Sequence, residues 1–188
     1  MTHRPTISPL TLLGALVLTL AAGAAASSQE ARIEGLSTRM DDERLLVSCR
    51  LVGAFDEAFE QRLRSGIPTP LVYRFVLERD RRRWFDQSVD SSRLQIVAMF
   101  NAVTSEYLIN FKHNGTLIES RVVRDLDQLR GAMTELADFP AFPLEERRSE
   151  VDHRLRVRVE LGTRTVLALI PRTEKTPWAR SDRLRFGG

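Results

Sequence analysis

Apolar and polar residues alternate with a period of two along most of the chain beyond residue 30. Such alternation is typical of β-strands that bury one face. It is clearest from Val151 to Leu161, where valine, leucine and His153 share one face and arginine and acidic residues share the other. The same pattern predicts strands over Arg44–Val52, Thr69–Arg79, Leu94–Phe100 and Glu106–Lys112. Ala31–Met40 is predicted as a hairpin partner of Arg44–Val52, and Thr116–Val123 as the strand that returns from a tight turn. Strands covered on both faces would be apolar throughout, so an antiparallel sheet with one wet face is expected.

Two short helices and one tight hairpin interrupt the alternation. Phe55, Phe59 and Leu63 recur at spacings of four around Asp56, a favoured N-cap residue, and Gly66 follows them. Apolar residues recur at spacings of three or four over Leu126–Leu136, before the proline-containing segment 139–143. Asn114-Gly115 lies between two predicted strands and favours a type I′ turn.

These elements predict a mainly β fold. Seven or eight short strands without a βαβ rhythm indicate an antiparallel, immunoglobulin-like β-sandwich with two short helices at its crossovers. An α+β open antiparallel sheet packed against both helices is the alternative. No repeat or low-complexity linker divides residues 27–188, so they are expected to form a single domain.

Residues 1–26 have the pattern of a secretory signal peptide. A short basic region precedes the charge-free run Leu10–Ala26, and Ala24-Ala25-Ala26 forms a cleavage site. As a helix that run would span about 26 Å, which is shorter than the hydrocarbon core of a bilayer, so cleavage is favoured over retention as an anchor. We expect an exported, periplasmic protein that is cleaved near Ala26.

The charge balance changes the choice of partner. The sequence pI is about 9.6, but the formal net charge is only +3, and Lys112 and Lys175 are the only lysines among 28 basic residues. Arginine remains charged at high pH and raises the pI without creating a large net field. A nucleic-acid partner is therefore not expected.

Catalytic and metal-binding patterns are sparse. Cys49 lies on the apolar face of its strand and is interpreted as an inert buried thiol, His153 is interpreted as an inward-facing core histidine, and His113 belongs to a hairpin tip. The sequence contains no G-x-S-x-G frame, no glycine-rich phosphate loop and no recognisable metal-ligand spacing. The interpretation is a non-catalytic protein without a cofactor or metal.

The segment that favours recognition is a basic and aromatic loop between two predicted strands. Arg81, Arg82 and Arg83 precede Trp84, and interfaces favour arginine and tryptophan. These four residues are the candidate interaction surface, suited to a protein partner, an anionic lipid headgroup or a nucleic acid, of which export disfavours the last. The alternative is a solvated loop whose Trp84 fills the end of the core.

A resemblance covers nearly the whole mature chain, from about Arg32 to Phe186. It rests on the order and spacing of RLLV (44–47), GAF (53–55), LRSGIP (63–68), VYR (72–74), RWFD (83–86), FPL (142–144) and RVRVEL (156–161). In these features the chain resembles a family of short exported proteins of Gram-negative bacteria that is defined only as a domain of unknown function. The resemblance implies a periplasmic protein without established catalytic residues, encoded near a membrane sensor kinase.

Together these observations lead to one functional expectation with two alternatives. The expected function is a non-catalytic exported domain that binds another cell-envelope protein, such as a membrane signalling protein. The alternatives are an envelope hydrolase whose acidic residues the sequence does not single out, and a binder of anionic lipid or lipopolysaccharide at the membrane surface.

Overall fold

The computed structural model describes residues 30–41, 43–79, 87–144, 149–166 and 170–186. These residues form β1 (Arg32–Met40), β2 (Arg44–Val52), α1 (Glu57–Arg64), β3 (Thr69–Arg79), β4 (Gln87–Asn101), β5 (Glu106–His113), β6 (Thr116–Val123), α2 (Leu126–Thr134), β7 (Glu135–Pro143), β8 (Ser149–Val166), β9 (Ile170–Lys175) and β10 (Ala179–Phe186). The mainly β fold with two short helices is confirmed. The signal-like residues 1–26 lie outside this description.

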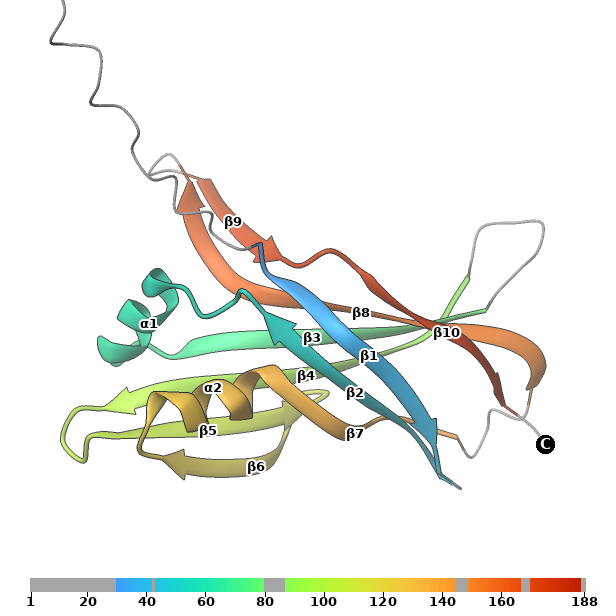
Figure 1. Cartoon of the computed structure of the whole chain (residues 1–188), viewed down its shortest axis with the longest axis horizontal. Helices are drawn as coiled ribbons and strands as arrows, with labels where there is room; N and C mark the ends of the chain where they lie inside the picture. Colours follow the sequence, from blue (N-terminus) through green and yellow to red (C-terminus); the bar gives the residue numbers. More distant parts are fainter. Residues whose placement is uncertain (1–29, 42, 80–86, 145–148, 167–169, 187–188) are drawn as a thin grey trace, which may run out of the picture.

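The strands form two antiparallel sheets (Figure 1). The small sheet has the order β1-β2-β7, and the large sheet has the order β10-β8-β3-β4-β5-β6, with β9 paired to the far end of β8. The small sheet crosses in front of the large one, and neither sheet closes into a barrel. The arrangement is that of an open sandwich, compatible with the prediction.

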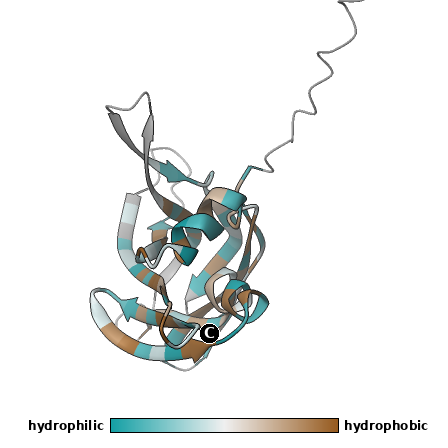
Figure 2. Ribbon diagram, turned by 90° about the vertical axis from the view of Figure 1, so that its left-hand side faces the viewer, coloured by the Kyte–Doolittle hydropathy of each residue, from teal (hydrophilic) through white to brown (hydrophobic). Residues whose placement is uncertain are grey.

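The core lies between the two sheets. Tyr73, Phe75 and Leu77 of β3 are completely buried, as are Val157 and other alternate residues of β8. Figure 2 shows the corresponding alternation as brown and teal bands along the ribbons. Burial of a large apolar side chain stabilises a fold by roughly 1.5–3 kcal/mol, so the face predicted from period two is the face that holds the sheets together.

The helices begin where the sequence places them. The Asp56 carboxylate accepts a 2.8 Å hydrogen bond from the Phe59 backbone nitrogen, and the Asp125 carboxylate accepts a 2.7 Å bond from that of Gln128. Both acids are therefore N-caps. The hairpin is also confirmed, because Asn114 and Gly115 have φ values of 48° and 92°, as a type I′ turn requires.

The second helix is shorter than predicted, and the segment after it is a strand. α2 ends at Thr134, and β7 pairs with β2 through residues that include Leu136 and Phe139. The proline-containing segment was expected to be a break. Because β7 is an edge strand, its prolines need not donate to a neighbouring strand on the outer side.

Ten strands are described, rather than seven or eight, because β7, β9 and β10 add to the predicted set. Within the described ranges, no helix combines the length and apolar character needed to cross a membrane.

Candidate functional site

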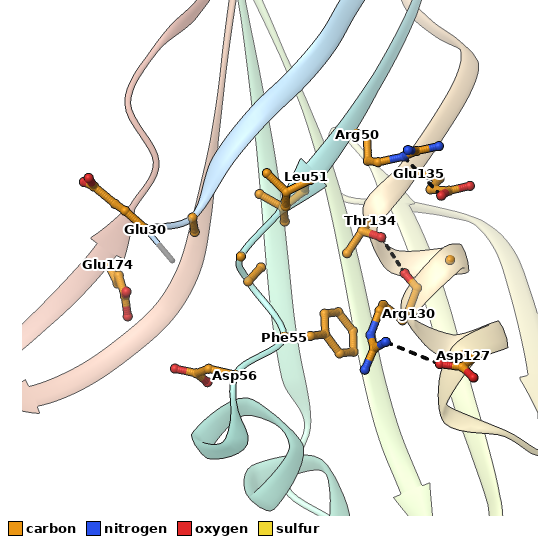
Figure 3. A pocket seen from close by; sticks show the side chains of 15 residues that line it. Glu30, Arg50, Leu51, Phe55, Asp56, Asp127, Arg130, Thr134, Glu135 and Glu174 are labelled. Atoms are coloured by element: carbon orange, nitrogen blue, oxygen red, sulfur yellow. Dashed lines mark hydrogen bonds and ion pairs between the residues drawn. The ribbon is translucent and has the colours of Figure 1, made fainter. Parts of the chain in front are cut away.

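A groove of about 970 Å³ opens beside the small sheet (Figure 3). It is built by the start of β1, the end of β2, the β2–α1 connection, α2 and β9. Leu51, Ala54 and Phe55 contribute apolar surface, while the charged lining residues are Glu30, Arg50, Asp56, Asp127, Arg130, Glu135 and Glu174. The groove therefore combines an apolar patch with charges from segments far apart in the sequence.

Local backbone features fix the β2–α1 side of this groove. Gly53 has φ 74°, a conformation that favours glycine, and it turns the chain out of β2. Asp56 then caps α1, and the rings of Phe55 and Phe59 lie 4.4 Å apart. Because Phe59 is buried in the core, the position of Phe55 in the groove is tied to the core.

Arg130 organises the α2 side. Its guanidinium lies 3.3 Å from the Asp127 carboxylate and 3.4 Å from that of Glu60, and it stands 5.7 Å from the centroid of the Phe55 ring. Arg50 forms a similar pair with Glu135 at 3.2 Å. In Figure 3, Glu30 and Glu174 lie across the groove from Arg130 and Asp127.

The charges in the groove do not balance. Five carboxylates and two guanidinium groups line it, so its formal charge is negative although the whole chain is positive. The Thr134 hydroxyl, which also lines the groove, donates a 2.8 Å hydrogen bond to the Arg130 carbonyl. The arrangement can bind a cationic group beside an apolar one. Within the described ranges, no three His, Cys, Asp or Glu residues are grouped so that they could hold a metal.

A second hollow of about 520 Å³ shares Arg50 and Glu135 with the groove and follows β2 toward Ser48. There Asp138, with φ 48°, donates a 2.9 Å backbone hydrogen bond to the Ser48 hydroxyl, and its carboxylate lies 3.1 Å from Arg39. The irregular part of β7 thus borders this hollow and extends the polar surface next to the groove.

The candidate surface chosen from the sequence, Arg81, Arg82, Arg83 and Trp84, lies in 80–86, outside the described residues. Its role stays a prediction. The described strands that precede and follow this segment in the sequence, β3 and β4, pair with each other in the large sheet.

The arginines of β8 form a partly covered cluster rather than an open row. The guanidinium groups of Arg156 and Arg158 lie 4.5 and 4.4 Å from the ring centroid of Trp178, in the connection between β9 and β10. Arg156 also lies 3.1 Å from the buried Glu78 carboxylate. These contacts engage both arginines within the domain.

Glu160 holds a second set of cations on the same face. Its carboxylate accepts a 2.8 Å hydrogen bond from Arg74 and lies 3.5 Å from the Lys175 ammonium. Partial burial by itself would raise the pKa of Glu160, but the bond and charge of Arg74, together with Lys175, lower it below the ordinary value.

The other candidate side chains occupy structural positions. Cys49 and His153 are buried, as predicted, and burial raises the pKa of Cys49 to about 12. His113 lies at the hairpin, with its Nε2 atom 2.8 Å from the Ser92 hydroxyl, and burial lowers the pKa of His113. None of these three residues lines the large groove.

Sequence reasoning missed the groove. Its charged residues come from separate segments and form no motif, and only Asp56 carried a local signal, as a helix cap.

No curated protein and no solved structure matches the chain significantly. Residues 28–169 match the family described as Domain of unknown function (DUF4390), which covers every described element except β9 and β10. The chain therefore belongs to the DUF4390 family.

Proposed function

We infer that this protein is a non-catalytic domain of the cell envelope that binds another envelope protein, and that a basic segment of that partner occupies the large groove. The observation that carries this proposal is the groove itself, where carboxylates outnumber guanidinium groups beside the half-buried ring of Phe55. Complementary charge guides the encounter of two proteins and orients them, while apolar contact supplies affinity.

The groove is suited to rigid recognition. The contacts of Phe55 with Phe59 and Arg130, together with the two capped helices, hold the walls in place without a ligand. A partner segment would therefore lose conformational freedom, but the domain would lose little, which favours affinity.

The carboxylates in the groove serve recognition better than hydrolysis. Asp127 and Glu135 are ion-paired with arginines, and Asp56 accepts a backbone hydrogen bond as a cap. A general acid needs a free path to a leaving group, whereas these carboxylates are engaged by neighbouring groups of the protein. An envelope hydrolase is therefore the weaker proposal.

Anionic lipid or lipopolysaccharide is also a weaker proposal for the described surface. The cations that would contact such headgroups include Arg156 and Arg158, which are engaged by Trp178 and Glu78. Peripheral membrane contact through the arginines of segment 80–86 is tested separately, by vesicle binding. Binding of anionic vesicles that is lost in an Arg81, Arg82 and Arg83 triple-alanine variant would support it.

Export is part of the proposal. The apolar run Leu10–Ala26 and its alanine triplet favour cleavage by a signal peptidase and release into the periplasm, where a membrane signalling protein is one available partner. The mature protein is expected to begin at Ser27 or within a few residues of it. Intact-mass measurement of envelope material checks this, and retention of Met1 would indicate a membrane-anchored protein instead.

The binding proposal is tested by crosslinking in living cells with a photoreactive amino acid in place of Phe55. A specific envelope adduct should form. It should be lost when the exposed groove acids are reversed in a Glu30→Lys, Asp127→Lys variant. The matched control is Glu43→Lys with Asp182→Lys, because these exposed acids lie outside the groove. Equal adduct in both double variants, or no specific adduct with the unaltered charges, would overturn the proposal.

A further inference from the structure

β6 forms one end of the large sheet and is almost fully exposed. In the described part of the chain it pairs with β5 alone, and seven of its eight residues are exposed. Leu117, Ile118 and Val122 are 54%, 53% and 59% exposed. Such an edge offers unpaired backbone groups to another strand, and natural proteins protect it with proline, lysine, a covering element, a bulge or inward-pointing charges, of which the last admit only a strand with matching opposite charges. β6 contains neither proline nor lysine.

The register with β5 places two opposite charges on one face of β6. Glu119 lies opposite Phe111 and Arg121 lies opposite Ile109, so both point to the face that carries the core. Arg121 bonds to the Glu119 carboxylate at 2.5 and 3.2 Å, and its guanidinium stands 5.2 Å from the Phe111 ring centroid. Both charges are therefore held at the open edge.

The order of residues along β6 is complementary to itself. In a two-fold antiparallel pair centred on Ser120, Glu119 faces the partner's Arg121, and Arg121 faces the partner's Glu119. Centring the pair one residue earlier or later would place two Glu119 carboxylates or two Arg121 guanidinium groups opposite each other. Like charges directly opposite destabilise a strand pair and opposite charges stabilise it, so charge selects the Ser120 register.

The same register places apolar residues together. Val122 faces the partner's Ile118, and Val122 also continues a row across the sheet, opposite Leu108, which in turn lies opposite Met99. A register shift between Phe111 and Lys112 leaves Ile118 as the extra residue of a bulge, so the regular part of the edge runs from Glu119 to Val123. In the Ser120 register, Glu119, Ser120 and Arg121 of each copy form the regular part of the pair, and the bulge residue Ile118 lies at each end of it, opposite the partner's Val122.

We propose that β6 is a docking surface for a second copy of this chain, and that the two large sheets join edge to edge through an antiparallel β6–β6 pair centred on Ser120. The contact is isologous, since the same strand serves both copies, and it closes after two subunits. No residue of β5 or β6 lines the large groove, so this surface is separate from the one proposed for an envelope partner.

The charge pattern supplies the first test, read by sedimentation equilibrium of the purified protein. The protein should be dimeric, and Glu119→Arg or Arg121→Glu alone should each raise the dimer dissociation constant by about tenfold, because two like-charged pairs replace two opposite ones. The double variant Glu119→Arg, Arg121→Glu should restore dimerisation. A monomeric protein, or a double variant as weak as the single ones, would overturn the proposal. Circular dichroism verifies that each variant is folded.

A cysteine at the two-fold axis tests the register. Ser120→Cys should form an intermolecular disulfide readily, because this position alone faces itself, while the equally exposed control Thr116→Cys should not. The native Cys49 is buried and does not compete. Crosslinking of Thr116→Cys in preference to Ser120→Cys would contradict the pairing. The Glu30→Lys, Asp127→Lys variant should still dimerise, which separates this proposal from the function proposed for the groove.

Discussion

The Tyr73 hydroxyl donates a 2.9 Å hydrogen bond to the backbone carbonyl of Met133. Both residues are completely buried, and the bond connects β3, in the middle of the large sheet, with the last turn of α2. Carbonyl groups in the last turn of a helix have no partner within the helix, so this side chain satisfies one of them. Burial also raises the pKa of Tyr73 well above its ordinary value.

Tyr73→Phe should lower the free energy of unfolding by about 1–3 kcal/mol, because the Met133 carbonyl would stay buried without its partner. Tyr107→Phe is the matched control, since Tyr107 is also buried and, within the described residues, its hydroxyl makes no hydrogen bond. Urea denaturation of both variants measures the difference. Equal losses would show that the Tyr73 bond contributes nothing beyond packing.

Cys49 should resist thiol reagents in the folded protein. Its side chain is buried on the inward face of β2, and its raised pKa keeps the thiol protonated at pH 8, whereas the thiolate is the reactive form. Labelling with a maleimide, followed by mass spectrometry, should show reaction only after denaturation. Rapid labelling of the folded protein would mean that β2 opens readily.

The same thiol predicts a loss of stability in alkali. An ordinary cysteine titrates near pH 9, while folded Cys49 does so at about 12. Between these values the unfolded chain loses the proton and the folded protein keeps it, so the free energy of unfolding falls by about 1.4 kcal/mol per pH unit. The decline should be smaller in Cys49→Ala, which removes the thiol and also its minor effect on the pKa of Tyr73, while burial continues to raise that pKa. If the free energy of unfolding fell equally with pH in both proteins, the prediction would be wrong.

Glu160 should contribute to stability at neutral pH and lose that contribution in acid. Its pKa is lowered in the folded protein, so its stabilisation is complete above its ordinary value of 4.5 and disappears as pH falls through the lowered value. Glu160→Gln should cost about 1–3 kcal/mol at pH 7, and the difference from the unaltered protein should shrink in acid. Glu34→Gln, which removes an exposed pair with Arg32, should have little effect at either pH.

The loop at 80–86 gives a separate prediction. If Arg81, Arg82 and Arg83 form a recognition surface open to solvent, replacing them with alanine should change stability by no more than about 0.5 kcal/mol, because exposed charges contribute little. If the loop is a recognition surface, envelope crosslinks should nevertheless decrease. Trp84→Ala distinguishes a core residue, whose loss costs about 3–5 kcal/mol, from an exposed anchor, whose loss weakens binding. Unchanged crosslinks in the arginine variant would make the loop a connection only.

Local pattern was sufficient for the strands that bury one face. Alternation predicted β2 and β3 with the bounds observed, the Asn114-Gly115 turn predicted β6 as the strand that returns from it, and Asp56 predicted the start of α1. It failed at β7, where Pro140 and Pro143 suggested a break and where an edge position accommodates proline. The strand propensity of proline is a property of that residue alone. Whether a strand can contain proline depends on which of its two sides is paired with another strand.

The groove could not be predicted from local sequence patterns, for a different reason. Glu30, Asp127 and Glu174 line one groove only because the segment before β1, α2 and β9 form its walls, and their positions in the sequence are unrelated. A charged residue at the end of an element looks the same whether it faces solvent or another charge. The loop at 80–86 was conspicuous because its residues are consecutive.

The pairing of β3 with β8 has a consequence for the order in which the chain folds. Val72 pairs with Glu160, and Arg79 with His153, more than seventy residues later in the sequence. Pairings so distant slow folding, because a long loop must close before they form. The central strand therefore stays incomplete until nearly the whole chain has emerged. A chain truncated before β8 should consequently aggregate, because β3 would lack its partner along one side.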